Sequence, residues 1–188
     1  MPYASSSNGH LARHVVAGLI GGLVASFAME RFQCALSRIS EDMGGASGGG
    51  GQQHRKPQSE PATYKAADAA SRAVTGKPLP QQDKPAGGSI VHYAFGGAVG
   101  AIYGAAASQN DEVTAWGGIP FGATVWLLAD EIGVPLSGLS KAPTEYPLTS
   151  HISALATHLV YGLTTESVRK LVMLPRLKIQ PTFSPKSR

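Results

Sequence analysis

Histidine and carboxylate side chains near the ends of apolar segments are the residues of this 188-residue chain that could do chemistry. A histidine titrates near neutral pH and a neighbouring carboxylate raises its pKa, so such a pair can sense or relay protons. The same groups could instead form hydrogen bonds that join helices, or could ligate zinc or iron. The candidate residues are Glu30, His92, Asp130, Glu131, His151 and His158.

No motif assigns a reaction to these six residues. The sequence holds no H-E-x-x-H pattern, and its single cysteine, Cys34, forms no C-x-x-C pair, so we predict no metal site. A nucleophile elbow, a Walker loop and a dinucleotide fingerprint are also missing from the sequence. We therefore predict no catalytic residue, no cofactor and no enzymatic activity.

The segments that must position these residues are apolar and nearly free of charge. Charged residues make up 15% of the chain, against about 25% in soluble domains. Apolar stretches long enough for a hydrocarbon core predict an all-α, four-helix transmembrane bundle in one domain. The predicted spans are 12–36, 89–108, 113–134 and 152–174. The predicted polar segments, a long first loop and a tail, are a flexible linker at 41–60, a short loop helix at 61–76 and a disordered basic tail at 175–188.

The predicted topology brings the six candidates to one face of the membrane. Spans one and three end there, and spans two and four begin there. His158 lies seven residues beyond His151, about 10 Å deeper on the same helix face. The tail from Arg169 carries six basic residues and no acidic one, which favours cytoplasmic termini.

Glycines inside the apolar segments recur at helical spacing, which lets helix backbones approach closely in lipid. The packing candidates are Gly18, Gly22, Gly96, Gly100, Gly104, Gly118 and Gly122. These faces could serve packing within one chain or a homo-oligomer. The spacing Gly18, Gly22, Glu30 returns as Gly118, Gly122, Asp130, and Tyr-Gly occurs in both the second and fourth spans. A duplicated two-helix hairpin would explain both echoes.

The basic residues of the chain suit a lipid surface better than a nucleic acid. The net charge is +4, and no basic stripe alternates with aromatic residues. We therefore expect the lipid bilayer as the partner and no nucleic acid.

The second half of the sequence resembles the YagU-like family of small bacterial inner-membrane proteins, whose domain has no known function. The residues that carry the resemblance are 135–139 (Pro-Leu-Ser-Gly-Leu), Pro143, Pro147, 158–160 (His-Leu-Val), Glu166, Arg169 and Lys170, together with 92–96 (His-Tyr-Ala-Phe-Gly) and 103–104 (Tyr-Gly). The resemblance implies a four-span, multi-pass protein of the bacterial inner membrane with cytoplasmic termini. It supplies no catalytic residue.

Three functions remain open on the sequence alone. The first is a non-enzymatic inner-membrane protein that acts in envelope or acid-stress physiology through its histidine and carboxylate residues. The second is a small transporter or channel subunit, suggested by the internal echo. The third is a metal-dependent membrane protein.

Overall fold

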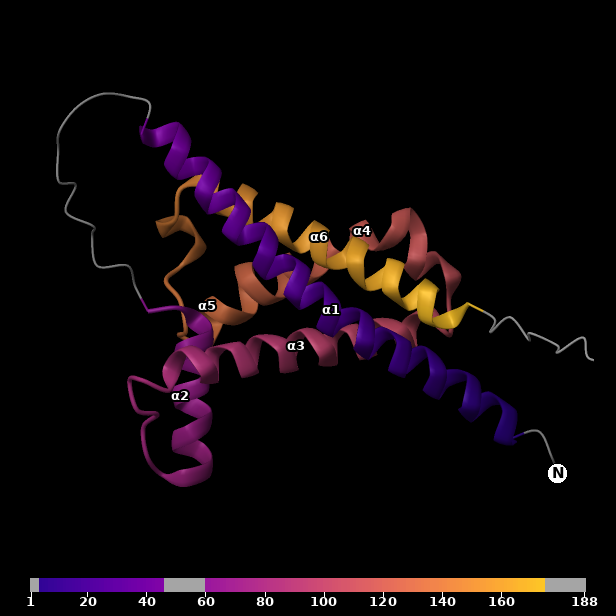
Figure 1. Cartoon of the computed structure of the whole chain (residues 1–188). Helices are drawn as coiled ribbons and strands as arrows, with labels where there is room; N and C mark the ends of the chain where they lie inside the picture. Colours follow the sequence, from indigo (N-terminus) through magenta and orange to yellow (C-terminus); the bar gives the residue numbers. More distant parts are fainter. Residues whose placement is uncertain (1–3, 46–59, 175–188) are drawn as a thin grey trace, which may run out of the picture.

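The computed structural model describes residues 4–45 and 60–174, and in these ranges the chain forms helices, turns and no β-strand (Figure 1). The helical elements are α1 (Ala4–Gly45), α2 (Ala62–Thr75), α3 (Lys84–Ala107), η1 (Asp111–Gly118), α4 (Ile119–Val125), η2 (Trp126–Gly133), α5 (Val134–Leu136), η3 (Pro143–Glu145) and α6 (Leu148–Met173). α1 ends at Gly45, inside the segment expected as a linker. The remainder of that linker, 46–59, and the tail 175–188 lie outside the described residues.

Three stretches of the described chain are long and apolar enough to cross a membrane: Gly9–Ile39, Lys84–Ala107 and Asp111–Leu136. Large apolar side chains along them face outward, including Phe27, Phe95 and Leu128, each more than half exposed. Exposing such an apolar surface to water is unfavourable, whereas contact with lipid tails is not.

The fourth predicted span falls in α6, which is not among these three apolar helices. α6 carries Glu166, Arg169 and Lys170 near its end, together with several threonines and serines. Some of its polar side chains are buried, since Thr157, Thr165 and Glu166 are each 1% exposed or less, whereas Lys170 is exposed. A bundle of four membrane-spanning helices is therefore not confirmed, because only three stretches of the described chain are apolar enough to cross a membrane.

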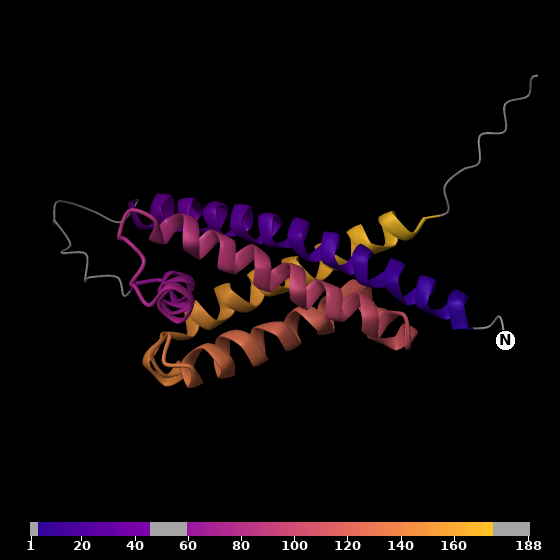
Figure 2. The ribbon, with the colours of Figure 1, turned by 90° about the horizontal axis from the view of Figure 1, so that it is seen from below.

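α1 contacts both α3 and α6, and α4 contacts α6. Figure 2 shows α1 and α3 side by side, with α6 crossing behind them and the α4–η2 segment on the far side of α6. The contacts of Gly18 with Gly104 and of Tyr93 with Glu30 make α1 and α3 antiparallel. Two ends result. The "α2 end" holds α2, the start of α3 and α5, and the "opposite end" holds the start of α1 and the end of α6.

The third apolar stretch is not one regular helix. Trp116, Gly117 and Gly118 have φ values of 55°, 67° and 86°, so the chain turns in the left-handed region before α4 begins at Ile119. The predicted span 113–134 thus begins within the 3-10 helix η1, before this left-handed turn. Further on, η2 is a π-helix, in which each N–H bonds five residues back instead of four.

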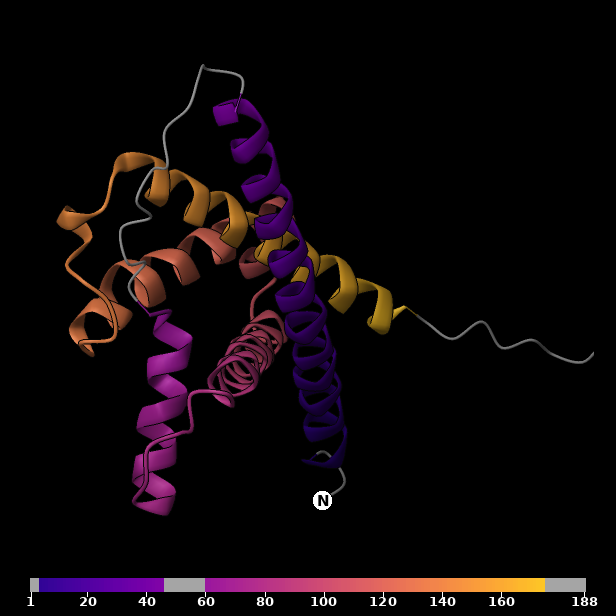
Figure 3. The same ribbon diagram turned by 60° about the vertical axis from the view of Figure 1, so that its left-hand side comes forward.

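α2 lies across the α2 end of the molecule. It is seen nearly end-on in Figure 2, whereas in Figure 3 α2 runs lengthwise and α3 is seen nearly end-on. Pro61 precedes the helix and Gly76, with φ 72°, terminates it by donating its N–H to the Arg72 carbonyl. Ala67 is buried against α3, where a side chain at Gly87 would lie 3.0 Å from its Cβ. α2 is therefore fixed to the first turn of the second apolar stretch.

Candidate functional site

His151, at the start of α6, holds together three segments of the α2 end. Its Nδ1 lies 2.7 Å from Glu131 Oε1 on η2, and its Nε2 lies 3.1 Å from the carbonyl oxygen of Pro143. Both neighbours are hydrogen-bond acceptors. A neutral imidazole carries one N–H and can satisfy one of them, whereas the protonated ring donates to both. The geometry therefore favours the charged form of His151.

The electrostatics of His151 agree with this geometry. The hydrogen bond with Glu131 raises the pKa of His151, burial opposes that effect, and the negative charge of Glu131 and the Pro143 carbonyl add to it. Since the side chain is 22% exposed, the ring can exchange protons with water. Titration of this ring would change the link between η2 and the 137–147 loop.

A second histidine and carboxylate pair lies deeper between the same two elements. Asp130 Oδ2 is 3.7 Å from Nδ1 of His158, and that nitrogen also lies 2.9 Å from the Ala154 carbonyl oxygen. His158 is buried. Asp130 also interacts electrostatically with Glu131 and with His92 of α3. Asp130 thus stands between histidines from two different helices.

Glu30 and His92 form separate contacts between α1 and α3. Glu30 Oε2 accepts a hydrogen bond of 2.8 Å from the Tyr93 hydroxyl, and Glu30 lies 3.8 Å from Arg31. His92 Nε2 is 3.3 Å from the Ser26 carbonyl oxygen. The six predicted site residues therefore lie in three groups: Glu30 with Tyr93, Glu131 with His151, and Asp130 with His158 and, more distantly, His92. Glu30 contacts no histidine that the structure describes.

The two carboxylates that pair with histidines of α6, Asp130 and Glu131, both come from the π-helix η2 (Trp126–Gly133). Wide helical turns of this kind are rare and occur frequently at functional sites. Gly133 follows the two acids, and a side chain there would lie 2.9 Å from the Leu128 carbonyl oxygen. The irregular helix brings Asp130 and Glu131, two consecutive residues, each to a histidine of α6.

A buried polar cluster at the opposite end was not predicted from the sequence. Glu166 accepts hydrogen bonds from the Tyr103 hydroxyl at 2.9 Å and from Nε and Nη2 of Arg169 at 2.6 and 2.9 Å. Nη1 of Arg169 donates to Nδ1 of His14 at 3.3 Å, and Lys170 Nζ lies 3.3 Å from Glu166. The cluster joins α1, α3 and α6. The i, i+3 spacing of Glu166 and Arg169 was the sequence signal for it.

This cluster resembles a structural joint more than a reactive site. Tyr103, Glu166 and Arg169 are buried, and the two oxygens of Glu166 face donors only. Since arginine can only donate, Nδ1 of His14 must accept and therefore carries no proton. A buried ion pair whose members are all hydrogen-bonded holds its helices in one arrangement.

The glycines predicted for packing lie where helix backbones meet. A Cβ on Gly18 would be 2.9 Å from Gly104 Cα, and one on Gly100 would be 2.7 Å from Gly22 Cα. Gly96 meets the side chain of Ser26. On the other side of the molecule, a Cβ on Gly118 would lie 3.1 Å from the Gly162 carbonyl carbon.

The same contacts repeat in the two halves of the chain. Gly18 meets Gly104 in the first half as Gly118 meets Gly162 in the second. The two halves also share a tyrosine, since Tyr103 directly precedes Gly104 and Tyr161 directly precedes Gly162. Tyr103 donates to Glu166 on α6, and Tyr161 donates to the Gly96 carbonyl on α3 at 2.6 Å. Each half of the chain thus donates a hydrogen bond from a tyrosine hydroxyl to the other half.

The described residues hold no group of three or more His, Cys, Asp or Glu side chains that could bind a metal ion. A family model described as a protein of unknown function (DUF1440) matches residues 70–167. That range covers α3, α4, η2 and most of α6, and so includes both His–carboxylate pairs. Neither the curated proteins nor the solved structures give a match to the chain.

Proposed function

The chain belongs to the DUF1440 family of proteins of unknown function, and on that premise we propose that it is a multi-pass membrane protein that responds to pH through His151. The observation that carries the proposal is the position of this ring between two acceptors, Glu131 Oε1 and the Pro143 carbonyl oxygen. Protonation strengthens both contacts at once and deprotonation weakens at least one.

The proposed setting is the bacterial inner membrane, with cytoplasmic termini and α6 as a fourth span over 152–174. His151 then precedes that span and lies at the membrane surface. α6 can occupy lipid because the polar groups in its middle, among them Thr157, Thr165 and Glu166, are buried, and Lys170 lies near its end. The glycine contacts supply the close packing that such a bundle needs.

A non-enzymatic role in envelope or acid-stress physiology fits this pH response. Asp130 and His158 provide a second titratable pair behind the first, and His92 lies within their electrostatic reach. Both histidine and carboxylate pairs lie in the range that the family model matches.

The sign of the pH dependence follows from the raised pKa of His151. The contact contributes fully below the pKa of a free histidine, about 6.5. It is lost as the pH rises through the higher pKa of the folded protein. The 137–147 loop should therefore be held closed in acid and released at alkaline pH.

The test is the rate at which a thiol reagent modifies a cysteine placed at Ser140, measured between about pH 5 and 9 in detergent micelles. Cys34 is first replaced by alanine. The rate is divided by that of a cysteine at Asn110, which removes the pH dependence of the thiol itself. We expect the ratio to rise with pH, and to stay level in His151→Gln, which keeps a hydrogen-bonding side chain but cannot titrate. An equal rise in both proteins would contradict the proposal.

The repeated helix contacts favour a second candidate, a small transporter or channel subunit. The contact of Gly18 with Gly104 joins α1 to α3, and that of Gly118 with Gly162 joins the start of α4 to α6. These two helix pairs would form parallel repeats, an arrangement found among transporters. Reconstituted liposomes would test it by fluxes of protons, metal ions and small solutes. A flux abolished by Asp130→Asn would support transport, and no flux above protein-free liposomes would remove it.

A further inference from the structure

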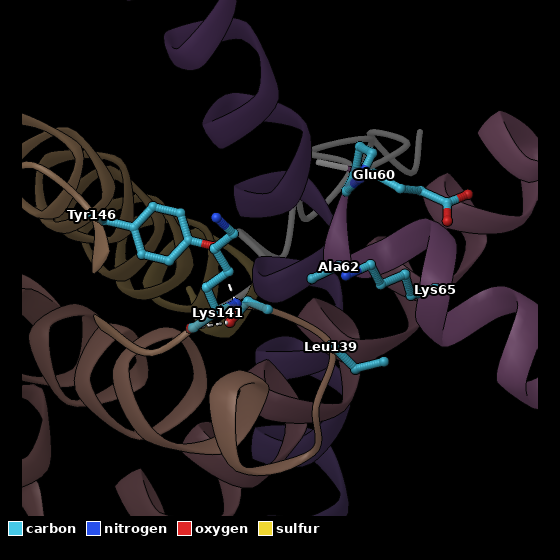
Figure 4. A pocket seen from close by; sticks show the side chains of 8 residues that line it. Glu60, Ala62, Lys65, Leu139, Lys141 and Tyr146 are labelled. Carbon is cyan, nitrogen blue, oxygen red and sulfur yellow. Dashed lines mark hydrogen bonds between the residues drawn. The ribbon is translucent and has the colours of Figure 1, made fainter. Parts of the chain in front are cut away.

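A cavity of about 210 Å³ opens at the α2 end, between the start of α2 and the loop that leads to α6 (Figure 4). Lys65 of α2 and Lys141 of the loop both line it, together with the Tyr146 side chain. Figure 4 shows that the two lysines reach it from different elements, whereas the carboxylate of Glu60 points away. No histidine lines the cavity.

Three side chains around the cavity can donate hydrogen bonds to a ligand: those of Lys65, Lys141 and Tyr146. The side-chain ammonium of Lys65 has no ion-pair or hydrogen-bond partner in the part of the chain that the structure describes. Lys141 Nζ is 3.7 Å from Glu145, and both side chains are more than half exposed. The Tyr146 oxygen accepts from the Lys141 backbone N–H at 3.3 Å, which leaves its own hydrogen free. The donors available therefore include two cations and a hydroxyl.

The acidic residue at the rim is already neutralised. Glu60 Oε1 lies 2.7 Å from Lys84 Nζ, and the side chain of Lys84 is only 16% exposed. The adjoining start of α2 adds positive potential, since Pro61 offers no side-chain cap to the first N–H groups of the helix. The net positive charge around the cavity favours the binding of a small, multiply charged anion.

The location of the cavity suggests where that anion comes from. α2 packs on Gly87 and Gly88, at the start of the apolar stretch Lys84–Ala107. A cavity beside the first helical turn of a membrane span lies at the level of lipid headgroups. Phosphate is the charged group that lipid headgroups and the surrounding solution share.

We propose that the cavity between Lys65 and Lys141 binds a phosphate group, of either a phospholipid headgroup or free phosphate. Two ammonium groups and the Tyr146 hydroxyl would each donate to a phosphate oxygen. Binding would tie α2 to the 137–147 loop, since each element supplies one lysine.

The experiment follows the acylation rates of individual lysines by mass spectrometry in the full-length protein. The reference condition is maltoside micelles in sodium chloride, which contain no phosphate. Inorganic phosphate at equal ionic strength is one arm, and bilayer discs of phosphatidylglycerol are the other. Lys77 is the internal control, because it is an exposed lysine of the loop after α2 that does not line the cavity.

We expect saturable protection of Lys65 and Lys141, by about fivefold or more at saturation, and little protection of Lys77. Protection by inorganic phosphate would identify a site open to solution, and protection by the lipid alone would identify a headgroup site. Lys141→Gln should abolish the protection of Lys65, whereas Lys77→Gln should not. Equal protection of all three lysines, or none in either arm, would overturn the proposal.

Discussion

The hydroxyl of Tyr103 donates to Oε2 of Glu166 across 2.9 Å, so that α3 and α6 are joined by two buried side chains 63 positions apart in the sequence. Arg169 occupies the other side of the same carboxylate and continues the chain of contacts to His14 on α1. The contacts among α1, α3 and α6 at this point therefore all involve the carboxylate of Glu166 or its partner Arg169. The α2 end of the molecule, with its pairs of histidine and carboxylate, is held by groups that can change charge.

Removing Arg169 should be the most damaging single change at this joint. Arg169→Ala leaves the charge of Glu166 buried with fewer partners, which costs about 3–5 kcal/mol of unfolding free energy. Tyr103→Phe removes one hydrogen bond to a charged group and should cost about 1.5–3 kcal/mol. Reversible unfolding in mixed detergent micelles measures both.

Lys170→Ala is the matched control, because its amine contacts the same carboxylate but its side chain is 61% exposed. An exposed ion pair contributes about 0–1 kcal/mol. Glu166→Gln together with Arg169→Ala should be less destabilising than Arg169→Ala alone, since no charge is then left buried. Equal losses for Lys170→Ala and Arg169→Ala would contradict this account of the joint.

Substitution of Gly100 should separate α1 from α3. An added Cβ would lie 2.7 Å from Gly22 Cα and 2.9 Å from Gly22 N, and these backbone atoms cannot move aside without a shift of the helix. We expect Gly100→Ala to lower the unfolding free energy by about 1–3 kcal/mol, the usual cost of overpacking. Gly9→Ala is the control, because a Cβ there meets nothing within 4 Å. A Gly100→Ala protein as stable as Gly9→Ala would refute the close contact.

Asp68 should hold the turn between α2 and α3 in place. Its Oδ1 accepts from the Leu79 backbone N–H at 2.7 Å, and its Oδ2 accepts from Arg72 at 2.9 Å. Asp68→Ala should speed hydrogen exchange of the Leu79 amide severalfold. Asp83→Ala should not, since Asp83 forms no side-chain cap at the start of α3.

The hydrogen bond from Arg72 lowers the pKa of Asp68, and the bond from Leu79 adds to this. The stabilisation is therefore present above the pKa of a free aspartate, about 3.9, and is lost as the pH falls through the lower folded value. Exchange at Leu79, corrected for its intrinsic rate, should rise only in strong acid. A change centred near neutral pH would point to another group.

Local signals in the sequence were sufficient for several elements. Pro61 and Gly76 bracket α2 because one suits the start of a helix and the other its left-handed end. Glycines spaced by four residues mark one face of a helix, and Gly96, Gly100 and Gly104 lie against α1. The likeness between the two halves was likewise visible as matching glycines and Tyr-Gly pairs.

What the sequence did not reveal depends on tertiary partners. Glu166 and Arg169 lower the mean hydropathy of α6. Only the fold shows that these two residues neutralise each other in the interior. The partner of Glu30 is Tyr93 instead of a histidine, because the antiparallel register of α1 and α3 brings that hydroxyl to the carboxylate. The φ of 55° at Trp116 is unusual for a residue other than glycine and breaks the third apolar stretch.

We propose that α3 and the segment after it cross a membrane and bring the His151 contacts to one surface. Single cysteines at Asn110 and Ser140, with Cys34 replaced by alanine, test it in intact bacteria with an impermeant thiol reagent. We predict that Ser140→Cys reacts from the periplasm, whereas Asn110→Cys reacts only after the inner membrane is opened. Reaction of Asn110→Cys alone would keep the spans and invert their orientation. Reaction of both sites from the same side of a closed membrane would contradict the account.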